Sequence, residues 1–146
     1  MKILKKNTVL SALVAYVIIL LIGKQSAVTP LILEKQLFLN LWGILFVMCG
    51  INLYIMRKNN PVKPNEDAAG AFCAFCLLSI VWCLLYFVLD AWSFAAGLSI
   101  VLVGVINSAV MLSAQNGVWW CLAMIPTEIW SVFVLTESFL QYKTMG

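Results

Sequence analysis

The chain of 146 residues contains no histidine, and only 10% of its residues are charged. An ordinary soluble domain is roughly one quarter charged, so this sequence has too few charged side chains to cover a water-facing surface. Without histidine it also lacks the commonest metal ligand and the commonest general base. No phosphate-binding loop, metal-ligand set or nucleophile–base pair is visible, so an enzyme is the weakest functional class.

The sequence also has no basic run with interleaved aromatic residues, which argues against nucleic acid as a partner. Its cysteines all fall inside apolar runs, where disulfides are not expected; they are Cys49, Cys73, Cys76, Cys83 and Cys121. The C-x-x-C spelling of Cys73 and Cys76 therefore favours packing residues over a redox or metal site.

What the chain has in abundance is apolar surface, with 64% hydrophobic residues and a mean hydropathy of +1.02. Lipid is the solvent that makes this composition stable, and a helix of about 20 residues crosses the hydrocarbon core. Five apolar runs of near that length cover residues 7–23, 37–56, 68–89, 94–112 and 118–140. The sequence therefore predicts an all-α integral membrane protein, in which residues 1–146 form a single five-transmembrane-helix bundle.

Lysine and arginine predict the orientation of this bundle. With the N-terminus inside, six of these residues lie on the inner side and three on the outer side, which favours a cytoplasmic N-terminus and an external C-terminus in the cell (inner) membrane. The first run also resembles a signal peptide, but Gln25-Ser26-Ala27 is a poor cleavage site, so we expect a retained helix.

Six tryptophans are present, and three of them lie well inside their predicted spans: Trp42, Trp82 and Trp130. Tryptophan near the end of a span is typical of the membrane interface. A deep indole needs a partner for its N–H or a cavity. The sequence leaves open whether these three line a ligand pocket or simply pack.

The second, third and fifth runs each carry a tryptophan motif. The second contains Trp42-Gly43-Ile44-Leu45-Phe46 followed by Gly50, and Phe38 precedes it by one helical turn. The third contains Ser79-x-x-Trp82 followed by Tyr86-Phe87, and the fifth contains Pro126-x-x-x-Trp130-x-x-Phe133. In span number, order and these motifs, nearly the whole chain resembles the TspO/MBR family of tryptophan-rich sensory or translocator proteins.

The family pattern is only partly kept, so the chain resembles a divergent member. The double proline and first tryptophan expected ahead of the second helix are replaced by a segment containing Leu33, Glu34 and Gln36. Serine stands at position 79 for the expected asparagine, Thr127 for the tyrosine, and Ser138 for the last asparagine.

The resemblance implies a cavity between helices that binds flat hydrophobic molecules, such as porphyrins or sterol-like compounds. It also implies homodimers, a sensory, receptor or transport-like role, and no required cofactor beyond a possible porphyrin or haem-type ligand. Aromatic side chains offer flat walls to planar ligands. Turnover of a bound porphyrin stays open.

The fifth run adds two features of its own. Pro126 is expected to kink this helix and open space, and Glu128 is expected near mid-span, where a carboxyl must be neutral, paired or facing a cavity. Glu128 either addresses the ligand or is a protonated acid bonded to a neighbour such as Asn52, Ser79 or Asn107. Glu137 is expected at the membrane interface.

Asn52 and Asn107 are expected to form interhelical hydrogen bonds, and small residues of the third run, including Gly70 and Ala74, suggest self-association. The resulting hypothesis is a membrane-embedded protein that senses or moves a planar hydrophobic ligand. Its candidate ligand-binding residues are Trp42, Phe46, Trp82, Phe87, Pro126, Glu128, Trp130 and Phe133. The alternatives are a small transporter with Glu128 as proton or cation site, and a structural subunit without a ligand.

Overall fold

A computed structural model of the protein describes residues 8–25, 34–59, 63–89, 91–115, 122 and 124–145. Within these residues the chain forms five long helices and one short π-helix, and no strand. They are α2 (Thr8–Lys24), α3 (Lys35–Asn59), α4 (Lys63–Cys83) with its π-helical continuation η1 (Leu84–Val88), α5 (Trp92–Ala114) and α7 (Ile125–Met145).

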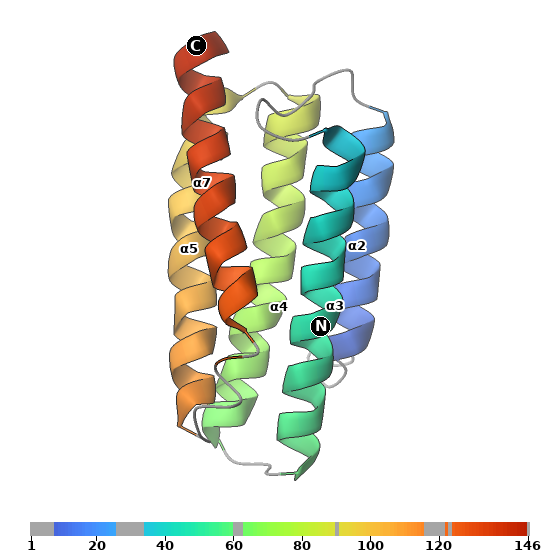
Figure 1. Cartoon of the computed structure of the whole chain (residues 1–146), viewed down its shortest axis with the longest axis vertical. Helices are drawn as coiled ribbons and strands as arrows, with labels where there is room; N and C mark the ends of the chain where they lie inside the picture. Colours follow the sequence, from blue (N-terminus) through green and yellow to red (C-terminus); the bar gives the residue numbers. More distant parts are fainter. Residues whose placement is uncertain are drawn as a thin grey trace.

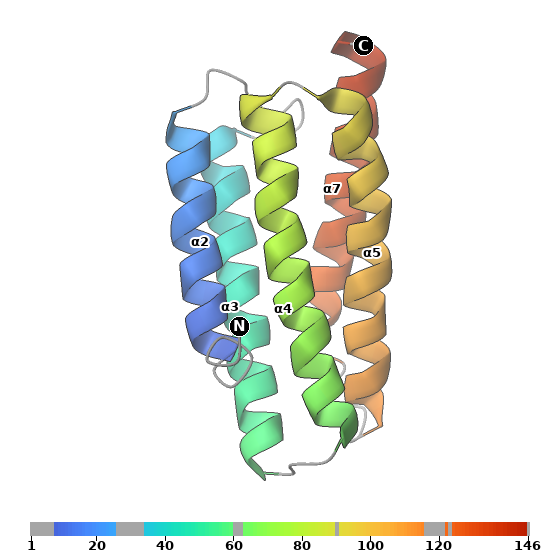
Figure 2. The same ribbon diagram turned by 180° about the vertical axis from the view of Figure 1, so that it is seen from behind.

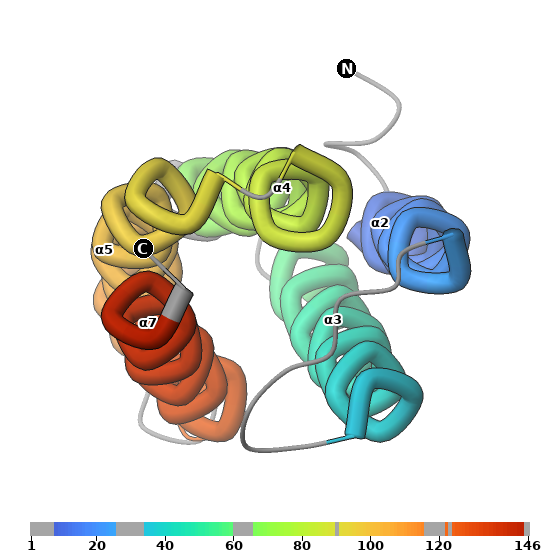
Figure 3. The backbone as a smooth tube through the Cα atoms, turned by 90° about the horizontal axis from the view of Figure 1, so that it is seen from above, coloured from blue at the N-terminus to red at the C-terminus, as the bar shows by residue number. Residues whose placement is uncertain are grey.

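The long helices run alternately up and down in one bundle (Figures 1 and 2), as short connections require. Seen from above, α2 lies beside α3, α7 lies beside α5, and α4 lies between these two pairs (Figure 3). The most extensive contacts join α2 to α3, α4 to α5 and α5 to α7, whereas α3 and α7 touch over a short stretch only. We call this short contact the α3–α7 seam.

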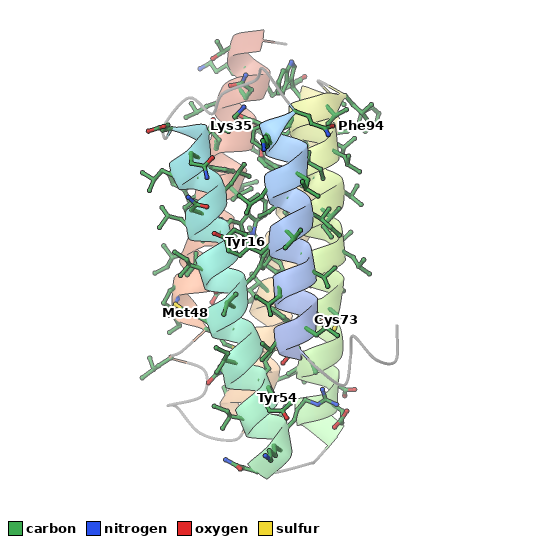
Figure 4. All side chains as sticks on the ribbon, turned by 90° about the vertical axis from the view of Figure 1, so that its right-hand side faces the viewer. Tyr16, Lys35, Met48, Tyr54, Cys73 and Phe94 are labelled. Atoms are coloured by element: carbon green, nitrogen blue, oxygen red, sulfur yellow. The ribbon has the colours of Figure 1, made fainter. Side chains whose placement is uncertain are left out.

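The outer surface of the bundle is apolar, as expected for a protein surrounded by lipid. Met48 and Phe94 point outward (Figure 4), and the Phe94 side chain is 71% exposed. Among the described helices, three are long and apolar enough to cross a membrane: Lys35–Asn59, Glu66–Val88 and Trp92–Ala114. Helix α2 is equally apolar but shorter, with 17 residues. The protein is therefore an all-helical membrane protein.

Two glycines let α2 and α3 approach each other closely. A Cβ atom at position 43 would lie 2.2 Å from the Tyr16 ring, and one at position 50 would lie 2.7 Å from the Thr8 carbonyl oxygen. The Thr8 hydroxyl donates to the Gly50 carbonyl, and the Tyr16 hydroxyl donates to Asn40 Oδ1 over 3.0 Å. Small residues and polar pairs are the usual means of joining helices in lipid.

The predicted kink at Pro126 is wrong, because Pro126 is the second residue of α7. In a first turn the missing N–H would have had no intrahelical partner, so proline fits there without bending the helix. The predicted fifth run starts at residue 118, but residues 116–121 lie outside the part that the structure describes.

The expected interhelical role of Asn107 is also wrong. Its side chain is exposed, and its amide nitrogen contacts the sulfur of Met111 one turn along the same helix, 3.7 Å away. Asn52 is half-buried, and its interhelical role stays a prediction.

Candidate functional site

Eight aromatic side chains meet between α3, the α4–η1 helix and α7. We call this group the aromatic cluster; its members are Phe38, Trp42, Phe46, Trp82, Tyr86, Phe87, Trp130 and Phe133. The ring centroids of Trp42 and Trp82 are 5.2 Å apart, and those of Trp42 and Trp130 are 6.4 Å apart. Such separations are typical of aromatic pairs in direct contact.

Helical spacing explains why these rings converge. Phe38, Trp42 and Phe46 follow one another at intervals of four residues and so lie on one face of α3. From α7, Trp130 and Phe133 face them across the α3–α7 seam, with the centroids of Phe38 and Trp130 5.2 Å apart. The seam is therefore closed mainly by aromatic rings.

The π-helix η1 places two consecutive aromatic residues against the cluster. Its wider turn shows in the bond from the Leu89 N–H to the Leu84 carbonyl, 2.9 Å long and five residues apart. Tyr86 stacks on Trp82 with centroids 4.6 Å apart, and Phe87 lies edge-on to Trp82 at 6.2 Å. Single π turns inside α-helices are frequent at functional sites.

The structure brings together six of the eight sequence-predicted ligand residues: Trp42, Phe46, Trp82, Phe87, Trp130 and Phe133. It does not bring in the other two. Pro126 is exposed, and Glu128 is half-buried in the first turn of α7. The adjacent Thr127 lies 2.8 Å from Cys49, near the middle of α3, so the first turn of α7 lies at mid-height in the bundle, and the mid-span depth of Glu128 stays a prediction.

The rings are in contact and fill the space where the sequence predicts a cavity. Phe38 at its centre is fully buried and touches five neighbouring rings. A ligand would therefore have to part these rings, and at the α3–α7 seam the two helices touch over a short stretch only.

Sequence reasoning missed a polar group at the upper end of the cluster. Glu137 is fully buried, and the Tyr86 hydroxyl donates to Glu137 Oε1 over 2.8 Å. Glu137 is thus enclosed by protein near the level where η1 ends and α5 begins, and its expected position at the membrane interface stays a prediction. The spacing from Trp130 to Glu137 is two helical turns, which is the signal that puts both residues on the same face.

A second hydrogen bond crosses the bundle beside the first. Trp82 Nε1 donates to Ser138 Oγ over 2.8 Å, and the Ser138 hydroxyl donates in turn to the Val134 carbonyl. One turn further along α7, Gln141 is buried, and its Oε1 atom has no hydrogen-bond partner.

Two of the three deep indoles have no partner for their N–H groups. The Nε1 atoms of Trp42 and Trp130 are buried and unbonded, whereas that of Trp82 is satisfied. An unsatisfied buried donor costs about 1–3 kcal/mol. Two unpaired donors in neighbouring rings are typical of a binding site in which the ligand supplies the hydrogen-bond acceptor.

The family model of the TspO/MBR family matches residues 23–142. The chain belongs to this family. No curated protein and no solved structure matches it. TspO/MBR membership makes it a membrane-embedded sensory or binding protein and brings no cofactor requirement. Within the described residues, no cluster of three or more His, Cys, Asp or Glu side chains could hold a metal ion.

Three of the departures from the TspO/MBR pattern, at positions 79, 127 and 138, have structural roles. The Ser79 hydroxyl donates to the Phe75 carbonyl within its own helix. Thr127 Oγ1 lies 2.8 Å from Cys49 Sγ and so links α7 to α3 below the rings. The Ser138 hydroxyl oxygen accepts a hydrogen bond from the Trp82 indole N–H. The aromatic residues that the chain keeps from the TspO/MBR motifs form the cluster, and the replaced positions supply hydroxyl groups around it.

Proposed function

We propose that this TspO/MBR protein binds a planar hydrophobic ligand, such as a porphyrin, between the rings of its aromatic cluster, and that it senses or moves this ligand. The observation that carries the proposal is the pair of unpartnered indole N–H groups of Trp42 and Trp130. Stacking on flat rings would supply most of the affinity, and an acceptor atom of the ligand would bond the indoles.

The ligand would enter by separating α3 from α7. The other neighbouring pairs of helices are joined over longer contacts, and Phe133, on the seam itself, is only partly buried. The same proposal includes a single five-transmembrane-helix domain, with the N-terminus cytoplasmic and the C-terminus outside the cell (inner) membrane. It also includes a homodimer, for which the small residues of α4 are the candidate contact.

The transporter alternative uses Glu128 as the proton or cation site. Glu128 is half-buried in the first turn of α7 and is not part of the aromatic cluster. We favour binding over ion-coupled transport because the two unpartnered indole N–H groups lie in the aromatic cluster.

The test is a titration of the purified protein with porphyrins, followed by quenching of tryptophan fluorescence and by the shift of the porphyrin absorption band. We expect saturable binding at micromolar ligand. Replacing Trp42 and Trp130 together by phenylalanine keeps aromatic walls but removes both N–H groups. The loss of one to two hydrogen bonds should weaken binding about tenfold or more.

The matched control is Phe94→Leu, which alters an aromatic side chain that points to lipid. It should leave the affinity unchanged. A folded wild-type protein that gives no saturable binding, or equal affinity in the wild type and the double tryptophan variant, would contradict the proposal.

A further inference from the structure

A polar cleft lies at the lower end of the bundle, where α3 ends and α4 begins (Figure 1). Its volume is about 250 Å³, and the described residues that line it are Tyr54, Arg57 and Lys58 of α3 and Glu66 of α4. Both helices are long and apolar enough to cross a membrane, so their ends lie near the membrane surface. The cleft is therefore at the depth of the phospholipid head groups.

One wall of this cleft is an ion pair with a fixed geometry. Arg57 Nη2 lies 2.8 Å from Glu66 Oε2, and Arg57 Nε donates to Glu66 Oε1 over 3.2 Å. Two parallel hydrogen bonds are the strong geometry for an arginine–carboxylate pair, and the Arg57 side chain is only 13% exposed. The two charges cancel, so the pair shapes the cleft and ties α3 to α4.

The charge that remains in the lining is that of Lys58. This side chain is exposed, and within the described residues neither its amine nor the Tyr54 hydroxyl has a hydrogen-bond or ionic partner. An amine and a hydroxyl one helical turn apart are both donors, which suits a phosphate oxygen. Five charged residues end α3 and begin α4, and they leave one positive charge: Arg57, Lys58, Lys63, Glu66 and Asp67.

An apolar strip of α3 leads from the cleft toward the membrane centre. Ile51, Tyr54 and Lys58 lie on one face of the helix, at the spacing i, i+3, i+7, and Ile55 lies beside them. Tyr54 lies near the lower end of the helix (Figure 4), and the two isoleucines are 44% and 43% exposed. Apolar, aromatic and cationic side chains thus follow the order of acyl chain, interface and phosphate in a lipid.

We propose that this cleft binds an anionic phospholipid, with the phosphate on the Lys58 amine and the Tyr54 hydroxyl and an acyl chain along Ile51 and Ile55. Basic pockets between transmembrane helices are typical sites for acidic head groups. In the orientation proposed above, the cleft faces the cytoplasmic leaflet, where such lipids give the surface its negative potential. The site is separate from the aromatic cluster and does not depend on a planar ligand.

The experiment compares phosphatidylglycerol with phosphatidylcholine of the same acyl chains. Both lipids carry a phosphate, but only the first has a net negative charge. The purified full chain in detergent is titrated with each lipid, and native mass spectrometry counts the bound molecules. We expect phosphatidylglycerol to bind about tenfold more tightly, as one charge-assisted hydrogen bond allows. Inorganic phosphate in excess should not displace it, because a free anion makes no contact with the apolar strip.

Lys58→Gln is the decisive variant. It should lower the preference for phosphatidylglycerol about fivefold, the usual contribution of one lysine near an anionic surface, whereas Lys58→Arg should keep the preference. Tyr54→Phe should weaken phosphatidylglycerol a few-fold. The matched control is Lys24→Gln, which removes an exposed lysine at the other end of the bundle, the last residue of α2. It should keep the full preference.

Three results would overturn the proposal. Equal losses in Lys58→Gln and Lys24→Gln would mean that net charge, and not the cleft, attracts the lipid. Equal binding of the two lipids by the wild type would mean that the cleft does not select a charge, and displacement by inorganic phosphate would mean a site for a soluble anion. Circular dichroism checks that each variant is folded.

Discussion

Helix α3 packs against two neighbours in opposite ways. Toward α2 it presents glycines, so the backbones approach closely, and the polar groups of Thr8 and Tyr16 both have partners. Toward α7 it presents large rings, and two indole N–H groups at that seam have no partner. The first interface is complete within the protein, and the second is not.

The difference indicates which interface is built to stay closed. Close glycine packing leaves no room for an added atom and gains dispersion along the whole contact. An aromatic seam holds by ring contacts that a flat ligand can reproduce, so opening it costs less once the ligand is bound. We therefore assign stability to the α2–α3 interface and ligand access to the α3–α7 seam.

The largest expected effect comes from Gly50→Val. The Cβ atom would lie 2.7 Å from the backbone oxygen of Thr8 and 3.1 Å from Ala12 Cβ, so the two helices must move apart. We expect a loss of about 3 kcal/mol in the free energy of unfolding, the upper part of the usual range for overpacking. Denaturant titration in mixed micelles, followed by circular dichroism, measures it.

The control is Gly104→Val, because a Cβ atom at position 104 has no neighbour within 4 Å. It introduces the same side chain into a helix at an open position and should cost far less. Equal losses in the two variants would mean that helix propensity, and not the close α2–α3 approach, decides the effect.

A smaller effect is expected from Tyr86→Phe, which removes the donor to the buried carboxyl of Glu137. Losing a hydrogen bond to a buried acid should cost about 2 kcal/mol. Replacing both partners, in Tyr86→Phe with Glu137→Met, should restore part of the loss, because neither group of this hydrogen bond is then left buried without the other. The same titration, arranged as a double-mutant cycle, measures the coupling.

An additive pair would contradict this prediction, since independent costs mean that the two side chains do not stabilise each other. A strong coupling would instead show that η1 is held to α7 through this bond. The upper end of the aromatic cluster would then be fixed by the protein itself, while the α3–α7 seam remains able to open.

The aromatic part of the site could be predicted from the sequence and the polar part could not. Trp42, Trp82 and Trp130 are recognisable in the sequence because indoles deep in apolar runs are rare. Helical spacing predicts that Phe46 and Phe133 lie on the same helix faces as Trp42 and Trp130. Hydropathy likewise gives the helical membrane fold without any knowledge of contacts.

Two features of α7 could not be predicted, its start and the burial of its acids. Apolar residues continue on both sides of Ile125, so hydropathy gives no start for this helix and places Pro126 inside it. Of the two acids, Glu137 is fully buried and Glu128 is half-buried. The partners of Tyr86 and Gln141 depend on which helices meet across the bundle, and no local pattern encodes that.

The finest test compares two tryptophans in the same cluster. Trp42 and Trp82 are both fully buried, and each loses the same atoms on replacement by phenylalanine. Only Trp82 has a bonded N–H, to Ser138. Trp82→Phe should therefore lower the free energy of unfolding by about 1 kcal/mol more than Trp42→Phe, the net value of one hydrogen bond.

Ligand binding should reverse the ranking of these two variants. In the ligand-free protein the unpaired N–H of Trp42 lowers stability, so its removal is tolerated. With a planar ligand bound, this N–H donates a hydrogen bond to the ligand. Trp42→Phe should therefore lose more of the ligand-induced stabilisation than Trp82→Phe. Thermal shifts with and without a porphyrin measure both. If the ranking is the same in the two conditions, the unpartnered indole has no part in binding, and the α3–α7 seam is packing of the same kind as the α2–α3 interface.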